Sequence, residues 1–216
     1  MPRKMADRYT HYGALAVNEK EGLDFRVSLR LVRQAPLAVV APHGGAIEPG
    51  TSEIADRLAD RDYSYYAFEG LKRSGNSVLH ITSTEFDEPR CLQLISTVST
   101  VVAVHGRGGE SAAICLGGLN QIMKKRIHEA LRKAGFEVSM AANPGLMGSN
   151  PRNLCNRGTS GAGVQLEISL GLRSRLFHSL DAGGRRKPTD LFNSFVGTLR
   201  AALFEALNPM PKQRFS

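Results

Sequence analysis

The sequence has no tryptophan, only three cysteines and no long apolar stretch. Because the cysteines are odd in number and form no Cys-x-x-Cys pair, they indicate neither a disulfide framework nor a thiolate zinc site, and a reducing compartment suits them. No segment approaches the roughly 18 consecutive apolar residues that a membrane helix requires. The basic segment 1–8 has no apolar run behind it, unlike a secretory signal. We therefore expect no membrane association, no signal peptide and a cytoplasmic location in the producing cell.

Acidic residues are also few relative to basic ones: the chain has 20 Asp and Glu residues and 28 Lys and Arg residues, which gives a net charge of +8. This surplus favours anionic partners through long-range attraction, although many soluble proteins are simply basic. The densest basic clusters, at 124–126 and 185–187, are short and far apart in the sequence. No segment interleaves aromatic and basic residues as a base-stacking surface does. We therefore expect no nucleic-acid partner, whereas an acidic substrate is compatible with the charge.

No internal repeat or low-complexity segment divides the 216 residues, and a hydrophobic content of 42% is typical of globular proteins. We predict a single domain spanning 1–216, with loosely ordered ends at 1–20 and 209–216. Apolar runs alternate along the chain with segments of helical periodicity. This alternation predicts an α/β fold in which helices cover both faces of a sheet.

Strands are expected where apolar residues run continuously or alternate: 25–31, 37–41, 63–68, 78–82, 98–104, 136–140 and 164–169. Helices are expected at 52–60, from 89 onward, at 119–134 and from 188 onward. The helix at 119–134 has the clearest 3.6-residue apolar stripe, and Gly135 ends it. Residues 143–163 are dominated by Asn, Gly and Pro. A loop of this length is often an active-site or binding loop, with a disordered insertion as the alternative.

Polar residues occur at the ends of three of the most apolar strands. His43 and Glu48 follow the first, His105 follows the second, and Glu167 lies in the third. Open α/β sheets bind ligands at the carboxyl ends of their strands, and imidazole nitrogen and carboxylate oxygen are common zinc ligands in hydrolases. His43, Glu48 and His105 are therefore candidate metal ligands, with Glu167 as a general base. Hydrogen-bonded structural histidines are an equally good interpretation of these residues alone.

The remaining histidines and the arginines are separate cases. His11, His80, His128 and His178 lack a glycine-flanked strand end, so we do not expect them to be ligands.

A guanidinium group matches a carboxylate with two hydrogen bonds, and an amide adds a further donor. Arg107, Asn156 and Arg157 are therefore candidates for orienting an acidic substrate. Surface charges are the alternative interpretation of the two arginines.

Other functional classes find less support in the motifs. A serine hydrolase needs Gly-x-Ser-x-Gly between a strand and a helix, but the nearest match, 158–162, lacks the last glycine and precedes a strand. No Gly-x-x-x-x-Gly-Lys-Ser/Thr segment for nucleotide binding occurs. A binder of acidic polymers that has lost catalysis would lack one of the four core residues, and all four are present.

The segment 43–55, HGGAIEPGTSEIA, resembles the signature of the poly-γ-glutamate hydrolase family, whose members are phage and bacterial zinc enzymes. The resemblance runs from residue 24 to residue 168. It includes Ala-Val-His-Gly at 103–106, Asn-Leu-Cys-Asn-Arg-Gly at 153–158 and Gly-Val-Gln-Leu-Glu at 163–167. The combination of these segments in this order is specific to the family.

This resemblance implies a fold similar to that of zinc carboxypeptidases, with a mixed, mostly parallel sheet between helices. It implies one Zn2+ ion held by three side chains, those of His43, Glu48 and His105. Glu167 would be the catalytic base and then the proton donor. By likeness to the carboxypeptidase pair, Asn156 and Arg157 would bind a substrate carboxylate.

The implied reaction is hydrolysis of γ-glutamyl amide bonds in poly-γ-glutamate or related acidic peptides. Zinc would polarise the scissile carbonyl and activate a water, while Glu167 moves a proton from that water to the leaving amine. From its position after His105, Arg107 would face an oxyanion or a substrate carboxylate. A zinc carboxypeptidase or amidase acting on a different small acidic peptide, and a non-catalytic binder of acidic polymers, are the alternatives. We expect an anionic polypeptide substrate and a monomer, and a phage product would reach its polymer after lysis.

Overall fold

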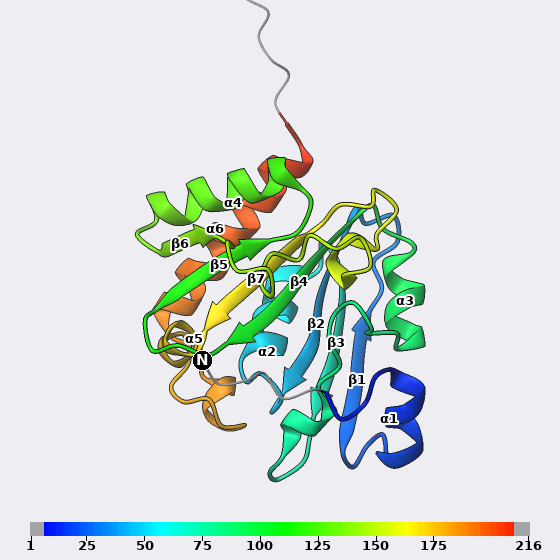
Figure 1. Cartoon of the computed structure of the whole chain (residues 1–216). Coiled ribbons are helices and arrows are strands. Elements are labelled where there is room, and N and C mark those ends of the chain that lie inside the picture. Colours follow the sequence, from blue (N-terminus) through cyan, green and yellow to red (C-terminus); the bar gives the residue numbers. More distant parts are fainter. Residues whose placement is uncertain (1–6, 210–216) are drawn as a thin grey trace, which may run out of the picture.

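The computed structural model describes residues 7–209, which form one seven-stranded sheet with helices on both faces (Figure 1). The strands are β1 (Phe25–Arg30), β2 (Leu37–Gly45), β3 (Ser64–Gly70), β4 (Thr100–Arg107), β5 (Ala113–Gly117), β6 (Glu137–Met140) and β7 (Val164–Ser169). The α-helices are α1 (Tyr12–Asn18), α2 (Thr51–Ala59), α3 (Pro89–Ile95), α4 (Gln121–Lys133), α5 (Leu170–Leu176) and α6 (Asp190–Leu207). Short 3₁₀ helices are η1 (Asn76–Leu79), η2 (Leu154–Asn156) and η3 (Gly184–Arg186).

The strand order across the sheet is β1-β3-β2-β4-β7-β5-β6. The four neighbours β3, β2, β4 and β7 run parallel at its centre. β1 is antiparallel to β3 and β5 is antiparallel to β7, whereas β6 is parallel to β5. The predicted α/β fold with a mixed, mostly parallel sheet is confirmed. Since the central strands end at the same edge, residues far apart in the sequence meet there.

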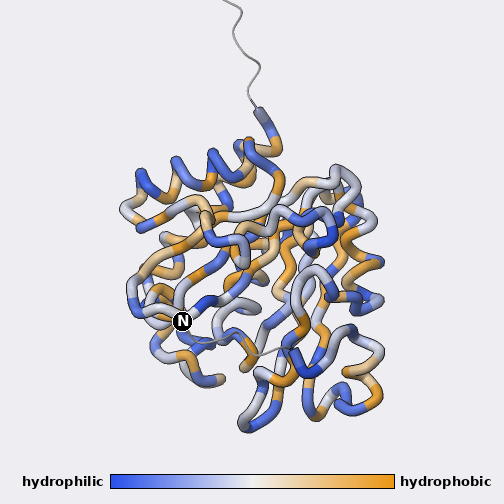
Figure 2. The backbone as a smooth tube through the Cα atoms, in the orientation of Figure 1, coloured by the Kyte–Doolittle hydropathy of each residue, from blue (hydrophilic) through white to orange (hydrophobic). Residues whose placement is uncertain are grey.

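Helices cover both faces of the sheet and produce two apolar cores. One core joins α2, α4, α5 and α6 to one face through side chains such as Leu58, Ile127 and Leu199. The other joins α1 and α3 to the opposite face through Leu15 and Leu94. Strands covered on both faces are apolar at nearly every position, which explains the continuous run at the start of β2. Figure 2 shows hydrophobic segments along the strands and hydrophilic residues along the outer side of α4.

Some elements differ from those expected. The strand predicted at 78–82 is wrong, because η1 forms instead after Gly75, which adopts a φ of 71°. β5 and α5 were not predicted; α5 begins directly after β7, so no loop residues separate the helix from the expected strand. Residues 7–20, expected to be loosely ordered, contain α1, whose Leu15 is fully buried. The other expected loose ends, 1–6 and 210–216, lie outside the described residues.

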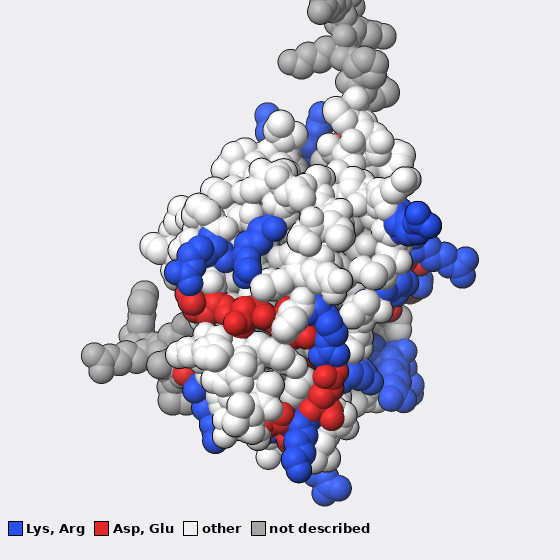
Figure 3. Space-filling view, turned by 90° about the vertical axis from the view of Figure 1, so that its right-hand side faces the viewer, with Lys and Arg blue, Asp and Glu red and all other residues white. Residues whose placement is uncertain are grey.

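Two surface properties bear on possible partners. Among residues 7–209, no helix combines the length and apolar character needed to cross a membrane. On the face shown in Figure 3, basic side chains lie on either side of a band of acidic side chains, and others are interspersed with acidic ones. This face therefore offers no continuous basic stripe of the kind that follows a nucleic-acid backbone.

Candidate active site

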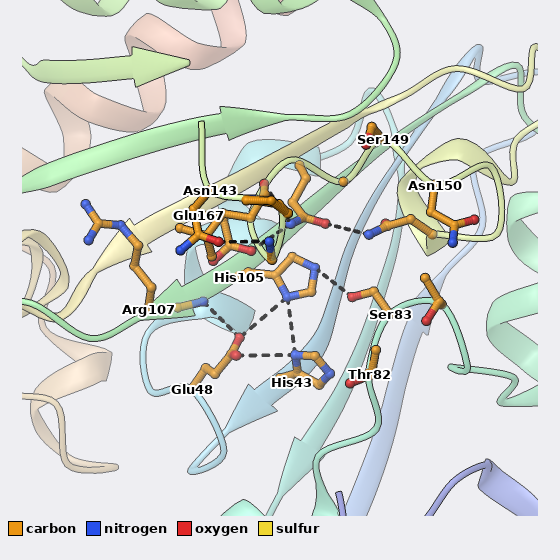
Figure 4. Close-up of a pocket in the computed structure, with 18 of the residues that line it drawn as sticks. His43, Glu48, Thr82, Ser83, His105, Arg107, Asn143, Ser149, Asn150 and Glu167 are labelled. Atoms are coloured by element: carbon orange, nitrogen blue, oxygen red, sulfur yellow. Dashed lines mark hydrogen bonds and ion pairs between the residues drawn. The ribbon is translucent and has the colours of Figure 1, made fainter. Parts of the chain in front are cut away.

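The polar residues at the strand ends meet at one edge of the sheet, where they line a cavity of about 710 Å³ (Figure 4). His43 lies near the end of β2, and Glu48 lies in the turn that follows it. His105 and Glu167 lie on the neighbouring strands β4 and β7, directly opposite each other in their pairing. The structure therefore brings together four residues that span more than half of the sequence.

A register shift in β2 turns His43 toward this cavity. Val39 and Ala41 face the core beneath α2, so strict alternation would turn His43 to that face as well. The pairing of β2 with β3 shifts between Ala41 and Gly44, and the His43 ring instead lies 6.3 Å from the Phe86 ring in the opposite core. Bulges of this kind often redirect a side chain next to an active site.

Three potential metal-ligand groups converge in the cavity. The Nδ1 atoms of His43 and His105 are 3.2 Å apart, and they lie 3.3 Å and 3.7 Å from the carboxylate oxygens of Glu48. A tetrahedral zinc ion with bonds of about 2.0–2.1 Å separates its ligand atoms by about 3.3 Å. The residue types and their spacing therefore fit a zinc ion, and all three ligand atoms lie within 4.8 Å of one another.

The outer nitrogen of each histidine ring contacts the surrounding protein. His43 Nε2 donates to the Ile81 carbonyl oxygen at 2.8 Å. Because a carbonyl only accepts, the proton of the neutral His43 ring sits on Nε2, and Nδ1 keeps its lone pair for a metal. His105 Nε2 lies 3.3 Å from Ser83 Oγ. Such outer contacts orient metal-binding imidazoles, and both rings are buried here.

Glu48 is held in place by backbone contacts and stays ionised. Its N–H donates to the His43 carbonyl at 2.9 Å, and the N–H of Gly106 donates to its Oε2 at 2.8 Å. Burial acts to raise the pKa of Glu48, but His43 and His105 outweigh burial and hold the pKa well below its ordinary value. A carboxylate that remains charged is suited to metal binding, since a metal competes with protons for its ligands.

Glu167 has the opposite electrostatic setting. Gln165 Nε2 donates to Glu167 Oε1 at 2.7 Å, and Asn153 Nδ2 donates to Gln165 Oε1 at 3.0 Å. Burial and the nearby Glu48 carboxylate raise the pKa of Glu167, although His105 opposes them. When two neighbouring carboxyl groups have pKa values shifted in opposite directions, the raised one is suited to moving protons. The two carboxyl groups of the site thus have pKa values shifted in opposite directions.

His80 lies next to the candidate ligands without being one of them. Its ring centroid is 3.9 Å from that of His43, and its Nδ1 lies 2.7 Å from Asp7 Oδ1. Burial and the adjacent His43 lower the pKa of His80 to about 4 despite the Asp7 carboxylate. The His80 ring is therefore neutral at neutral pH and forms part of the cavity wall. Sequence patterns did not indicate that His80 lies next to the candidate ligands, because residues 78–82 were expected to form a strand.

A model of the poly-gamma-glutamate hydrolase family matches residues 9–198. The chain belongs to the poly-γ-glutamate hydrolase family. This match confirms the resemblance found in the sequence, and it extends that resemblance toward both ends of the chain.

Two sequence relatives and two solved structures match this family member over 90% or more of its length. UPF0714 protein YmaC of Bacillus subtilis (strain 168) is 36% identical over 204 residues, covering 94% of this chain and 86% of YmaC. The SPbeta prophage-derived UPF0714 protein YoqZ of that strain is 36% identical over 196 residues, covering 90% of this chain and 70% of YoqZ. The structure of a bacteriophage poly-γ-glutamate hydrolase matches with a TM-score of 0.91 at 31% identity, covering 95% of this chain and 100% of the other. A zinc-free apo form of YNDL matches with a TM-score of 0.86 at 36% identity, covering 94% of this chain and 98% of the YNDL chain.

In this hydrolase-family chain, Arg107 lies at one side of the metal-ligand group, and Ser149 and Asn150 lie at the other (Figure 4). Arg107 Nε is buried and has no hydrogen-bond partner among the described residues. The loop 143–163, expected to be an active-site or binding loop, contributes to the cavity lining, although no single lining residue in it was predicted. The other polar lining residues provide hydroxyl and amide groups: Thr82, Ser83, Thr84, Asn143, Ser149, Asn150, Asn153 and Gln165.

The structure does not bring the other two expected substrate-binding residues to the cavity wall. Asn156 is buried, and its amide group contacts only the protein interior: Nδ2 donates to the carbonyls of Gly148 and Asn150, and Oδ1 accepts from two backbone N–H groups. Arg157 donates to the Phe86 carbonyl at 2.9 Å and lines a separate hollow of about 280 Å³. Thr84 lines both hollows. Asn156 thus stabilises the long loop, and Arg157 lies outside the cavity that contains Glu167.

Proposed function

We propose that this chain is a zinc-dependent hydrolase of γ-glutamyl amide bonds in poly-γ-glutamate or related acidic peptides. The observation that carries the proposal is the convergence of His43, Glu48 and His105 next to Glu167, in a member of the poly-γ-glutamate hydrolase family. The zinc-free apo form of YNDL supports zinc as the metal. One ion held by three side chains would retain an open position, as catalytic zinc sites do.

Zinc bound by these ligands would polarise the scissile carbonyl and lower the pKa of a water toward about 7. The protein's own part begins with Glu167. Since Gln165 holds Oε1, we assign Glu167 Oε2 as the atom that takes a proton from the attacking water and returns it to the leaving amine. The link from Asn153 through Gln165 keeps the Glu167 carboxylate from rotating during both transfers.

Arg107 is suited to bind an α-carboxylate of the polymer. Among the described residues that line the cavity, it is the single Lys or Arg. A substrate carboxylate would supply the partner that its buried Nε lacks. The hydroxyl and amide groups across the cavity would pair with the amide bonds of the polymer backbone. Together, these carboxylate and amide contacts would position the scissile bond over the candidate metal-ligand group.

The proposal is tested by digesting poly-γ-glutamate with purified protein, with and without a chelator, and measuring product size. We expect the untreated protein to shorten the polymer, the chelated protein to be inactive, and added zinc to restore activity. Polymer that is bound but never shortened would support a non-catalytic binder instead. Cleavage of other acidic peptides with poly-γ-glutamate left intact would support a different carboxypeptidase or amidase activity.

Replacing Arg107 tests its proposed role in substrate binding. We expect Arg107→Ala to raise KM for poly-γ-glutamate about 10- to 100-fold, the worth of a charge-assisted hydrogen bond of about 1.5–3 kcal/mol. Arg157→Ala is the matched comparison, because Arg157 lies in the neighbouring hollow, and we expect its KM to stay within about twofold of the wild-type value. Steady-state kinetics on acidic and neutral substrates measure both. A large effect of Arg157→Ala combined with a small effect of Arg107→Ala would assign the substrate carboxylate to Arg157.

A further inference from the structure

A buried arginine behind the cavity contacts all three segments that contribute to the candidate metal centre. Arg173 lies in α5, is only 4% exposed, and is absent from the cavity lining. Within the described chain its side chain donates three hydrogen bonds, and every acceptor is a backbone carbonyl. Nη1 donates to Pro49 at 2.6 Å, Nε donates to Ile168 at 3.2 Å, and Nη2 donates to Arg107 at 3.2 Å.

Each of these three carbonyl groups belongs to a residue that closely follows a candidate ligand or the proposed base in the sequence. Pro49 directly follows Glu48, and Ile168 directly follows Glu167. The third carbonyl, that of Arg107, belongs to the end of β4 just beyond His105. One rigid, planar guanidinium group therefore ties together three chain segments, each within two residues of a ligand or the proposed base.

Close packing against Gly106 strengthens this link. A Cβ atom at Gly106 would lie 2.7 Å from Arg173 Cζ, so only glycine lets the strand pass this close to the guanidinium group. The N–H of the same Gly106 donates to Glu48 Oε2 at 2.8 Å. The position of the guanidinium group is thus transmitted to a ligand carboxylate through a single residue.

The charge of Arg173 is also unusual for its setting. Burying a guanidinium group costs free energy, and no carboxylate from residues 7–209 bonds to it directly. Burial lowers the pKa of Arg173, while the nearby Glu48 and Glu167 carboxylates oppose that shift. The cation is stabilised by the same two carboxylates whose positions it fixes.

We propose that Arg173 is a positioning residue, which sets the relative placement of Glu48, His105 and Glu167 through their neighbouring carbonyls. The inference rests on the proposed function and adds a residue that never touches substrate. Residues behind metal ligands commonly affect metal affinity by about 10- to 100-fold. Removing the guanidinium group should therefore weaken zinc binding and lower kcat, whereas KM at saturating zinc should change less than kcat because the Arg173 side chain does not line the cavity.

The test measures zinc affinity by chelator competition, together with kcat and KM at saturating zinc, for Arg173→Met, Arg173→Lys and Arg175→Met. Arg175 is an exposed arginine on the same helix, so its substitution controls for loss of charge from α5. We expect Arg173→Met to bind zinc about 10- to 100-fold more weakly and to lose kcat. Arg173→Lys should recover part of both, since an ammonium group keeps the charge but lacks the planar fork. Arg175→Met should match the wild type.

Wild-type zinc affinity and kcat in Arg173→Met, with only a lower melting temperature, would overturn the proposal. If Arg173→Met does not fold, Arg173→Lys decides, because it keeps the charge and most of the aliphatic stem. Equal zinc affinity in Arg173→Lys and the wild type would then count against the inference. Wild-type protein that binds no zinc would refute the proposed function instead. In that case a crystal structure of Arg173→Lys still tests the positioning, and unchanged distances among Glu48, His105 and Glu167 would overturn it.

Discussion

Glu167→Gln is expected to keep zinc binding intact while lowering kcat by about 10²- to 10⁴-fold, the usual contribution of a general acid or base. Gln has nearly the same shape as Glu, and its side-chain oxygen can still accept the hydrogen bond from Gln165. The amide cannot take up and return a proton, so both proposed transfers would fail. Metal analysis and steady-state kinetics on poly-γ-glutamate measure the two effects separately.

A matched substitution makes this result interpretable. Glu129 lies exposed on α4, far from the cavity lining, and Glu129→Gln should retain wild-type activity. Near-normal turnover in Glu167→Gln would remove Glu167 from the mechanism. Loss of zinc in Glu167→Gln would instead show that Glu167 acts as a ligand.

Removing one candidate ligand should have an equally large effect. We expect His105→Ala to lose its zinc and to reduce kcat/KM by about 10³-fold or more, because metal polarisation contributes several kcal/mol to such reactions. Zinc should raise the melting temperature of the wild type, since a ligand that binds only the folded state stabilises it. The same addition should leave the melting temperature of His105→Ala unchanged. Metal analysis, kinetics and calorimetry measure these effects.

His178→Ala provides the control for this experiment. His178 is exposed and is not part of the candidate ligand group, so its variant should bind about one zinc ion and show the wild-type response to added metal. If His105→Ala kept both zinc and activity, the metal site would have to lie elsewhere. The circular dichroism spectra of His105→Ala and the wild type should be compared first, because His105 is buried and its replacement could disturb β4.

The sequence predicted the position of polar site residues best where those residues directly follow strongly apolar strands. The runs before His43 and His105 are buried on both faces, so their carboxyl ends could be placed at one edge of a sheet. That the two histidines and Glu48 actually converge depends on the register shift in β2, which no local pattern reveals. The family resemblance supplied the roles that the residues alone left open.

Features that depend on distant contacts could not be predicted. Arg173 lies in an unpredicted seven-residue helix and bonds to Pro49, 124 residues earlier in the chain. Asn156 lies within a recognised family segment, yet its amide group bonds to backbone groups of the loop and to the N–H of Leu119, just before α4. A residue type that suits substrate binding therefore served loop stability instead. Only the three-dimensional path of residues 143–163 distinguishes the two roles.

The contacts of Asn156 have a consequence for how substrate binds. Its single amide group joins Gly148 and Gly163 of the long loop to Leu119 before α4. Conformational entropy that these bonds remove when the protein folds would not be lost again when the proposed polymer binds. A wall ordered in advance would allow successive stretches of the proposed polymer substrate to be held without a lid that must open and close at every turnover.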